Sequence, residues 1–227
     1  MPSLCFSRRL LTASVLWSLP MAASAQALSG QLTILEKSSA RSADLAEAVI
    51  WLESTSGGAA PARQTSQIGM HGKQFVPRVQ VVSSGGSVAF PNDDPFRHNV
   101  FSKSGPSEFD LGLYARGETR QMQFTRSGVY PIFCNIHARM VAYVVSIPTP
   151  YVVRPGADGR YAFRDVPPGA YTLKVWHERG GELTRPITLP MDGGATVPIQ
   201  LDARSYRFVQ HKNKFGGSYT MTGSERY

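Results

Sequence analysis

Four side chains with metal-binding donors lie in two short stretches of the sequence. Cys134, His137 and Met140 follow one another at intervals of three residues, and His98 begins an apolar stretch upstream. One thiolate, two imidazoles and a weak thioether form the donor set of a mononuclear blue copper site. Thiolate selects a soft or borderline metal, imidazole suits copper, and a weak axial sulfur disfavours the square-planar geometry of Cu(II). The four residues therefore indicate a site for one type 1 copper ion.

Ordinary structural roles compete with this hypothesis, residue by residue. A single histidine in a β-protein usually lies on the surface or is satisfied in the core, and we expect this of His71, His177 and His211. Met70 beside His71 lacks a supporting partner in the sequence. Cys134, His137 and Met140 differ from these residues, because all three lie in one short loop. A structural zinc site would need more cysteines or a closed Cys/His set, so copper is favoured.

The first 25 residues have the features of a secretory signal peptide. Arg8 and Arg9 precede an apolar run over 10–19, and Ala23-Ser24-Ala25 gives a small-residue cleavage site. The run is shorter than the roughly 20 apolar residues that span a bilayer, so we expect no membrane span in the mature chain. We expect export to the periplasm, by the general route or, given the paired arginines, the twin-arginine route.

Removal of this segment changes the cysteine count and the charge. Cys5 is lost, which leaves Cys134 as the sole cysteine, and a lone cysteine forms no internal disulfide in an oxidising compartment. Two of the 24 basic and none of the 16 acidic residues are also lost, so the net charge falls from +8 to +6. This charge favours an acidic partner. Export, and the lack of a clustered basic and aromatic face, argue against nucleic acid.

Short extended segments separated by turns dominate the remaining sequence. The 227 residues are 42% hydrophobic and include 21 Gly and 16 Pro, a composition that fits strands joined by turns better than a large α/β enzyme. A helical pattern at 40–50 is the best of its kind, although 49–52 is more typical of a strand. We predict an all-β fold with strands at 31–35, 79–82, 87–90, 119–124, 129–133, 142–147, 160–163 and 171–176.

The central part of the chain resembles the plastocyanin/azurin-type cupredoxins over residues 64–147. The resemblance rests on the segments 73–77, 79–82, 85–86, 88–90, 92–93 and 98–100. The Cys-x2-His-x2-Met spacing is similar to that of amicyanin. The resemblance implies a Greek-key sandwich in which His98, Cys134 and His137 are equatorial copper ligands and Met140 is axial. It also implies that Asn99 links the two ligand loops by hydrogen bonds.

The flanks resemble a smaller sandwich of the carboxypeptidase regulatory-like type, also called transthyretin-like or Cna-B-like. The segments 28–34, 48–53, 158–163, 166–176 and 197–201 carry this resemblance. We predict a signal peptide at 1–25, the first strands of the flanking sandwich at 26–62, an inserted cupredoxin at 63–147, the remainder of the flanking sandwich at 148–202 and a basic, flexible and solvated tail at 203–227. Docking of this tail to an acidic partner or surface is the functional alternative. The alternative is two consecutive domains, with 28–60 as extra cupredoxin strands.

The whole chain resembles exported bacterial cupredoxin-domain proteins labelled methylamine-utilisation proteins. This label implies a setting and not a substrate. Our leading hypothesis is a one-electron carrier; we do not expect an enzyme, because the sequence lacks H-E-x-x-H, G-x-S-x-G and phosphate-binding glycine motifs. The expected partners are a c-type cytochrome or a periplasmic dehydrogenase. A copper-binding module for delivery or storage uses the same ligands and stays open as an alternative, as does an adhesion protein that binds a glycan or another partner.

Overall fold

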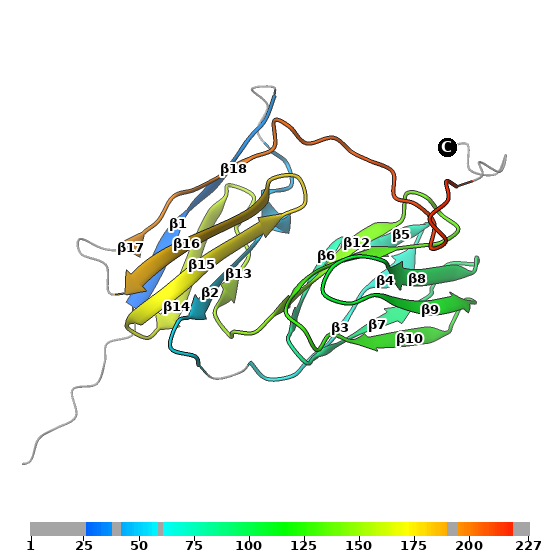
Figure 1. Cartoon of the computed structure of the whole chain (residues 1–227), viewed down its shortest axis with the longest axis horizontal. Helices are drawn as coiled ribbons and strands as arrows, with labels where there is room; N and C mark the ends of the chain where they lie inside the picture. Colours follow the sequence, from blue (N-terminus) through cyan, green and yellow to red (C-terminus); the bar gives the residue numbers. More distant parts are fainter. Residues whose placement is uncertain (1–25, 38–41, 59–60, 190–194, 220–227) are drawn as a thin grey trace, which may run out of the picture.

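Two β-sandwiches lie side by side in the molecule (Figure 1). The computed structural model describes residues 26–37, 42–58, 61–189 and 195–219. We call residues 65–147 the inner sandwich, because the chain enters it and leaves it from the other one, and residues 26–54 with 152–202 the outer sandwich. No helix among the described residues is long and apolar enough to cross a membrane.

The outer sandwich consists of two four-stranded sheets. One has the order β14-β1-β17, with β18 also paired to β1, and the other has the order β13-β2-β15-β16. A short 3-10 helix, η1 (Leu45–Glu47), leads into β2. The strands are β1 (Gln26–Leu35), β2 (Val49–Ser54), β13 (Val152–Val153), β14 (Arg160–Val166), β15 (Gly169–His177), β16 (Gly181–Leu189), β17 (Ala195–Thr196) and β18 (Ile199–Asp202).

Alternation of apolar side chains explains how these strands form a core. In β15, Tyr171, Leu173 and Val175 are buried, while Thr172 and Lys174 between them point to the other face and are half-buried. Val49–Leu52 of β2 is buried on both faces, because one face packs in the outer core and the other in the junction with the inner sandwich. The continuous apolar run of β2 is typical of such a doubly covered strand.

The inner sandwich packs a five-stranded sheet against a three-stranded sheet. Their orders are β6-β12-β11-β8-β9 and β10-β7-β3, and the hairpin β4-β5 lies beside them. The shared core contains buried residues of both sheets. The strands are β3 (Thr65–Gln67), β4 (Gly69–His71), β5 (Gln74–Val76), β6 (Val79–Ser83), β7 (Ser87–Pro91), β8 (His98–Ser102), β9 (Phe109–Tyr114), β10 (Thr119–Gln123), β11 (Gly128–Phe133) and β12 (Val141–Ile147).

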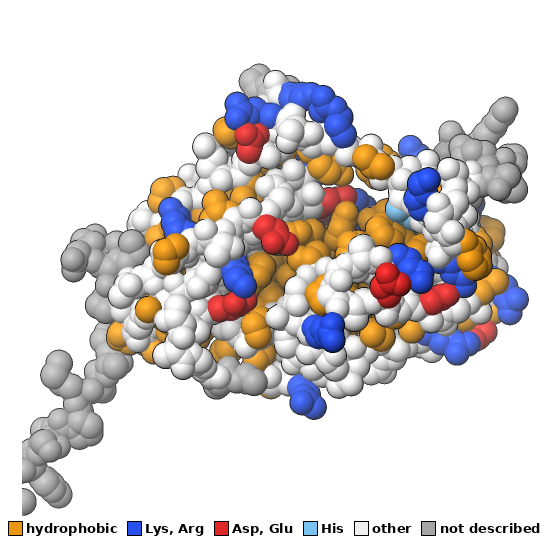
Figure 2. Space-filling view, viewed as in Figure 1, with side chains coloured by type: hydrophobic (Ala, Val, Ile, Leu, Met, Phe, Trp, Pro, Cys, Tyr) orange, Lys and Arg blue, Asp and Glu red, His pale blue; other side chains and the backbone are white. Residues whose placement is uncertain are grey.

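A third apolar cluster and a charged pair join the two sandwiches. The cluster combines β2 and β15 of the outer sandwich with β6 and β12 of the inner one, and the rings of Tyr143 and Trp176 lie 5.0 Å apart. Beside it, the Arg78 guanidinium donates two hydrogen bonds of 2.7 Å to the Glu178 carboxylate. Figure 2 shows hydrophobic side chains gathered along this junction. The junction therefore combines apolar burial with a bidentate ion pair.

The all-β prediction with two sandwiches is confirmed. Strand β2 pairs with β13 and β15, so segments from both sides of the inner sandwich share one sheet, as insertion requires. The predicted domain boundaries stay a proposal, and the signal peptide lies outside the described residues. The helical pattern at 40–50 yields only η1 and the start of β2 among the described residues. Where the sequence predicts a solvated tail, residues 203–219 return to the inner sandwich (Figure 1).

Candidate metal centre

Neighbouring strands of the five-stranded sheet position the four predicted ligands. His98 is the first residue of β8, a strand that is buried along its whole length. Cys134 follows the last residue of β11, and Met140 comes directly before β12. Strand β11 pairs with both β8 and β12, with Phe133 opposite Phe101. This pairing brings the upstream histidine to the same end of the sheet as the 134–140 loop.

The structure brings three of the predicted ligands together at bonding distance from one point. The Nδ1 atoms of His98 and His137 are 3.0 Å apart, and Cys134 Sγ lies 3.9 and 3.6 Å from them, respectively. Nitrogen and sulfur bond transition metals at about 2.0–2.3 Å, so two ligands of one ion lie at most about 4.5 Å apart. The three donor atoms meet this requirement. Their chemistry, one thiolate and two imidazoles, fits copper.

Met140 lies in the same apolar core as Cys134. Its side chain is fully buried in the apolar cluster that also contains Cys134. Its backbone N–H donates to the carbonyl of His137 at 3.1 Å, and its carbonyl accepts from the Cys134 N–H at 3.3 Å. These two bonds close the loop into a compact turn. Its role as axial ligand stays a prediction.

Asp94 is a partner of the site that the sequence reasoning missed. Its carboxylate lies 2.8 Å from His98 Nε2, so that nitrogen carries the proton and Nδ1 keeps its lone pair for a metal. The same carboxylate accepts the backbone N–H groups of Gly72 and Lys73 at 2.6 and 2.8 Å. Burial raises the pKa of Asp94, but the hydrogen bonds from Lys73, His98 and Gly72 outweigh it and the pKa is lowered.

The turn that presents those two N–H groups has an unusual backbone. Gly72 and Lys73 form the two-residue loop between β4 and β5, with φ of 59° and 58°. Positive φ at both positions is typical of a type I′ hairpin turn, which matches the twist of the strands. The two amide N–H groups donate to one carboxylate, so the hairpin and the His98 ring are both hydrogen-bonded to Asp94. The only signal in the sequence was an acidic residue four positions before the predicted ligand.

His137 is the ligand nearest to solvent. Burial first, then the neighbouring His98 ring and the Lys73 charge, lowers the pKa of His137 to about 4. Burial also lowers the pKa of His98, against the opposing hydrogen bond and charge of Asp94. Both rings are therefore neutral at neutral pH, as metal binding requires. Beside His137 the Ile136 side chain is 40% exposed, whereas Ala138 is buried.

The other candidate residues take structural positions. His71 is exposed on β4, His177 is buried at the end of β15, and His211 stacks on the ring of Phe133 at 4.3 Å. None of the three belongs to the donor group. Asn99 departs from its expected role, because its amide donates to Asp110 at 2.7 Å and its Oδ1 has no partner among the described residues.

No family model matches this sequence, and no curated protein matches it. Solved structures similar to this chain include a purple cupredoxin from Nitrosopumilus maritimus, 22% identical, with a TM-score of 0.33, covering 36% of this chain and 98% of that one. Amicyanin from Paracoccus versutus is 20% identical, with a TM-score of 0.34, covering 42% of this chain and 90% of that one.

A copper-containing nitrite reductase from Thermus scotoductus is also similar to this chain. It is 26% identical, with a TM-score of 0.36, and the alignment covers 41% of this chain. The chain spans about a quarter of the length of that enzyme, 24%.

Proposed function

We propose that this protein is a periplasmic type 1 copper protein that carries one electron at a time between redox partners. The observation that carries the proposal is the convergence of Cys134 Sγ with the Nδ1 atoms of His98 and His137. Together with Met140, these residues would hold the ion. Copper held there would supply a one-electron couple between Cu(II) and Cu(I).

The chain's own groups perform the supporting tasks. The buried Cys134 supplies a thiolate, which binds the metal after losing its proton. Asp94 fixes the tautomer and the orientation of the His98 ring through Nε2. The apolar surroundings keep water from the thiolate, and the partly exposed His137, beside Ile136, offers a short path to a partner protein.

Burial of the donors favours a carrier over a delivery protein. Cys134 and His98 are both 0% exposed, so an acceptor protein cannot reach them without opening the loop. Copper delivery proceeds through exchange of ligands between two proteins and needs accessible donors. Slow loss of copper to an apo-acceptor would support the carrier, and rapid loss would favour delivery or storage. Glycan binding by copper-free protein would instead support an adhesion role.

Spectroscopy of the copper-loaded protein tests the proposal directly. We expect an intense visible charge-transfer band and the narrow copper hyperfine splitting of a thiolate-bound type 1 site. Cys134→Ser removes the thiolate, so both signals should be lost, whereas Met140→Leu should keep the colour and raise the reduction potential. His71→Ala is the matched control, because it removes an exposed imidazole that is not one of the three converging donors. A Cys134→Ser protein with an undiminished band would refute the ligand assignment.

The partner and the location are tested separately. A mature charge of +6 favours an acidic cytochrome c or dehydrogenase surface, and such attraction weakens as salt screens it. The rate of electron exchange with an acidic c-type cytochrome should therefore fall with ionic strength. Cleavage after Ala25, seen by mass spectrometry of the periplasmic fraction, tests export.

A further inference from the structure

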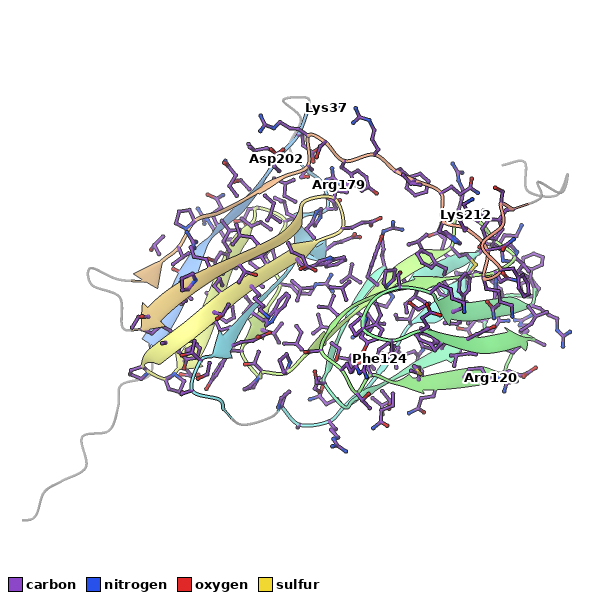
Figure 3. The ribbon with its side chains drawn as sticks, in the orientation of Figure 1. Lys37, Arg120, Phe124, Arg179, Asp202 and Lys212 are labelled. Carbon is purple, nitrogen blue, oxygen red and sulfur yellow. The ribbon has the colours of Figure 1, made fainter. Side chains whose placement is uncertain are left out.

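The C-terminal segment, residues 203–219, leaves the outer sandwich and crosses to the metal-centre end of the inner one. Figure 1 shows this path above the two sandwiches, and Lys212 marks the part that lies over the inner sandwich (Figure 3). Near its start, the Tyr206 hydroxyl contacts Glu178 at 3.4 Å. The bridging part is exposed, with Phe208 and Val209 at 60% and 80%. The segment is thus anchored at its two ends.

Three contacts join this segment to the loop that carries Cys134. The Tyr219 hydroxyl donates to the backbone carbonyl of Cys134 at 2.7 Å. The backbone N–H of Lys214 donates to the side-chain oxygen of the next residue, Asn135, at 2.9 Å. The His211 ring stacks on Phe133, the residue before Cys134, and lies 3.1 Å from the Tyr219 hydroxyl. The contacts therefore cover three consecutive residues centred on the thiolate ligand.

The same segment is also linked to β8, the strand that carries His98. The Lys214 ammonium donates to Asp110 Oδ2 at 2.6 Å, while Asp110 Oδ1 accepts the amide of Asn99, which follows His98. Burial raises the pKa of Asp110, but the hydrogen bonds from Lys214 and Asn99 outweigh it, so the carboxylate is ionised. Lys214 thus connects the Cys134 loop, through Asn135, with the His98 strand, through Asp110 and Asn99.

Directed hydrogen bonds, and not a continuous apolar contact, hold the segment in place. A pocket of about 320 Å³ remains between it and the inner sandwich, with Phe101, Phe133 and His211 in its lining. A compact turn at 213–217, closed by hydrogen bonds of Asn213, gives Lys214 its orientation. Loss of a single contact therefore changes how firmly the ligand loop is held.

We propose that the C-terminal segment is a working part of the metal centre, in which Lys214 and Tyr219 are positioning residues for the Cys134 loop and the His98 strand. The inference rests on the proposed copper site. Groups outside the ligands that orient them typically change metal affinity by about 10–100-fold when removed. The segment completes the link between the two ligand loops, to which the Asn99 side chain contributes through Asp110.

Two chain lengths test the role of the whole segment. A protein that ends at Arg207 lacks the contacts at 211–219 but keeps Tyr206, and a protein that ends at Tyr219 is its control. We monitor copper transfer to a chelator through the loss of the visible band. We expect this transfer to be about tenfold faster in the shorter chain. The control should match the full chain. Equal rates and equal copper hyperfine splittings in all three would overturn the proposal.

Single substitutions keep the test valid if the shorter chain does not fold. Tyr219→Phe removes only the hydroxyl on the Cys134 carbonyl, and Tyr206→Phe removes an equivalent hydroxyl at the junction. Lys214→Met and Lys212→Met remove one ammonium each, and only the first is bonded to Asp110. We expect faster copper loss in the Tyr219 and Lys214 variants alone. Equal behaviour of each variant and its control would count against the proposal.

A copper-free measurement separates this inference from the proposed function. In the apo-protein, the N–H groups of Cys134 and Met140 are bonded within the loop, and we expect their hydrogen exchange to accelerate in Tyr219→Phe but not in Tyr206→Phe. A full chain without a visible band would refute the copper site, yet this exchange result would still show whether the segment holds the loop. Unchanged exchange in Tyr219→Phe refutes the positioning role.

Discussion

The two sandwiches differ in the side chains that they bury. Both apolar clusters consist of aliphatic and aromatic side chains, together with sulfur-bearing ones in the inner cluster, but the inner sandwich also buries His98, Asp94 and Asn92, whereas the outer one buries His177 at the end of β15. A buried polar group costs free energy unless it is hydrogen-bonded. The outer core therefore serves stability, and the inner one gives up part of it to hold a reactive group of side chains.

Two fully buried histidines make the same contrast at the level of single residues. His177 of the outer sandwich accepts the N–H groups of Arg179 and Gly180 on Nδ1, so its proton lies on Nε2, 3.5 Å from Asp44. His98 places its Nε2 on Asp94 and leaves Nδ1 to the metal centre. One ring is used to close a turn and the other to present a lone pair. The partners of each ring decide its role, because burial is the same for both.

Copper removal is expected to lower the stability to unfolding more than any substitution below, and to lower that of the inner sandwich alone. A ligand that binds only the folded state stabilises it by about 4 kcal/mol when its free concentration is about a thousandfold above Kd. Calorimetry of the apo- and copper-loaded proteins should show one transition that moves to higher temperature and one that does not. A shift of both transitions by the same amount would show that the sandwiches unfold as one unit.

Leu173→Ala tests the outer core. Leu173 is fully buried, and a cavity of this kind costs about 3 kcal/mol of unfolding free energy. Beyond the first 25 residues the sequence contains only Trp51 and Trp176, which lie on outer-sandwich strands in the junction with the inner one, so tryptophan fluorescence reports loss of the outer sandwich or of the junction. We expect an earlier fluorescence transition and an unchanged visible band. A weakened band would show that the outer core shapes the metal centre.

Asp94→Ala sharpens the comparison of the two histidines. Loss of the carboxylate frees the His98 ring to turn, so copper affinity should fall by about 10–100-fold, measured by competition with a chelator. Asp44→Ala is the matched control, since it removes a carboxylate beside the other buried histidine. The control should lower the fluorescence midpoint and leave copper affinity unchanged. Equal affinities in the two variants would contradict the role assigned to Asp94.

Arg78→Met has the smallest expected effect and concerns the junction. The Arg78–Glu178 pair is partly exposed, which limits its contribution to about 1 kcal/mol. Its loss should widen the gap between the two unfolding transitions, because it weakens the coupling of the sandwiches. A double-mutant cycle with Glu178→Gln measures that coupling. No interaction energy in the cycle would mean that the apolar cluster alone joins the two parts.

Strong local alternation made most strands predictable, and weak alternation hid others. The predicted segments 79–82, 129–133 and 171–176 lie within β6, β11 and β15. Strand β16 was not predicted, because it carries Pro186 and alternates exposed with half-buried residues and so lacks an apolar pattern. Its pairing with β15 over nine positions supplies the order that its own sequence does not.

The residues of the metal centre also include some that were predictable from the sequence and some that were not. Cys134, His137 and Met140 were predictable because three residues separate each from the next, and the chain itself holds them near one another. His98 lies far upstream in the sequence; residue type made it a candidate, and the family resemblance implied its role as a ligand. The contacts of Asp94, Lys214 and Tyr219 had no such signal, since a carboxylate, an ammonium and a hydroxyl are common in any loop. The basic C-terminal stretch gave no indication that it returns to the inner sandwich.

By itself the sequence determined the all-β class, the alternation that selects core faces and the sulfur- and nitrogen-bearing loop at 134–140. These properties are local, and residue type with spacing fixes them. The tertiary structure decided which nitrogen of His98 faces the cysteine, 36 positions away, which carboxylate orients that ring, and where the C-terminal segment docks. Such contacts follow from strand pairing and packing, because they join atoms whose distance the covalent chain leaves free.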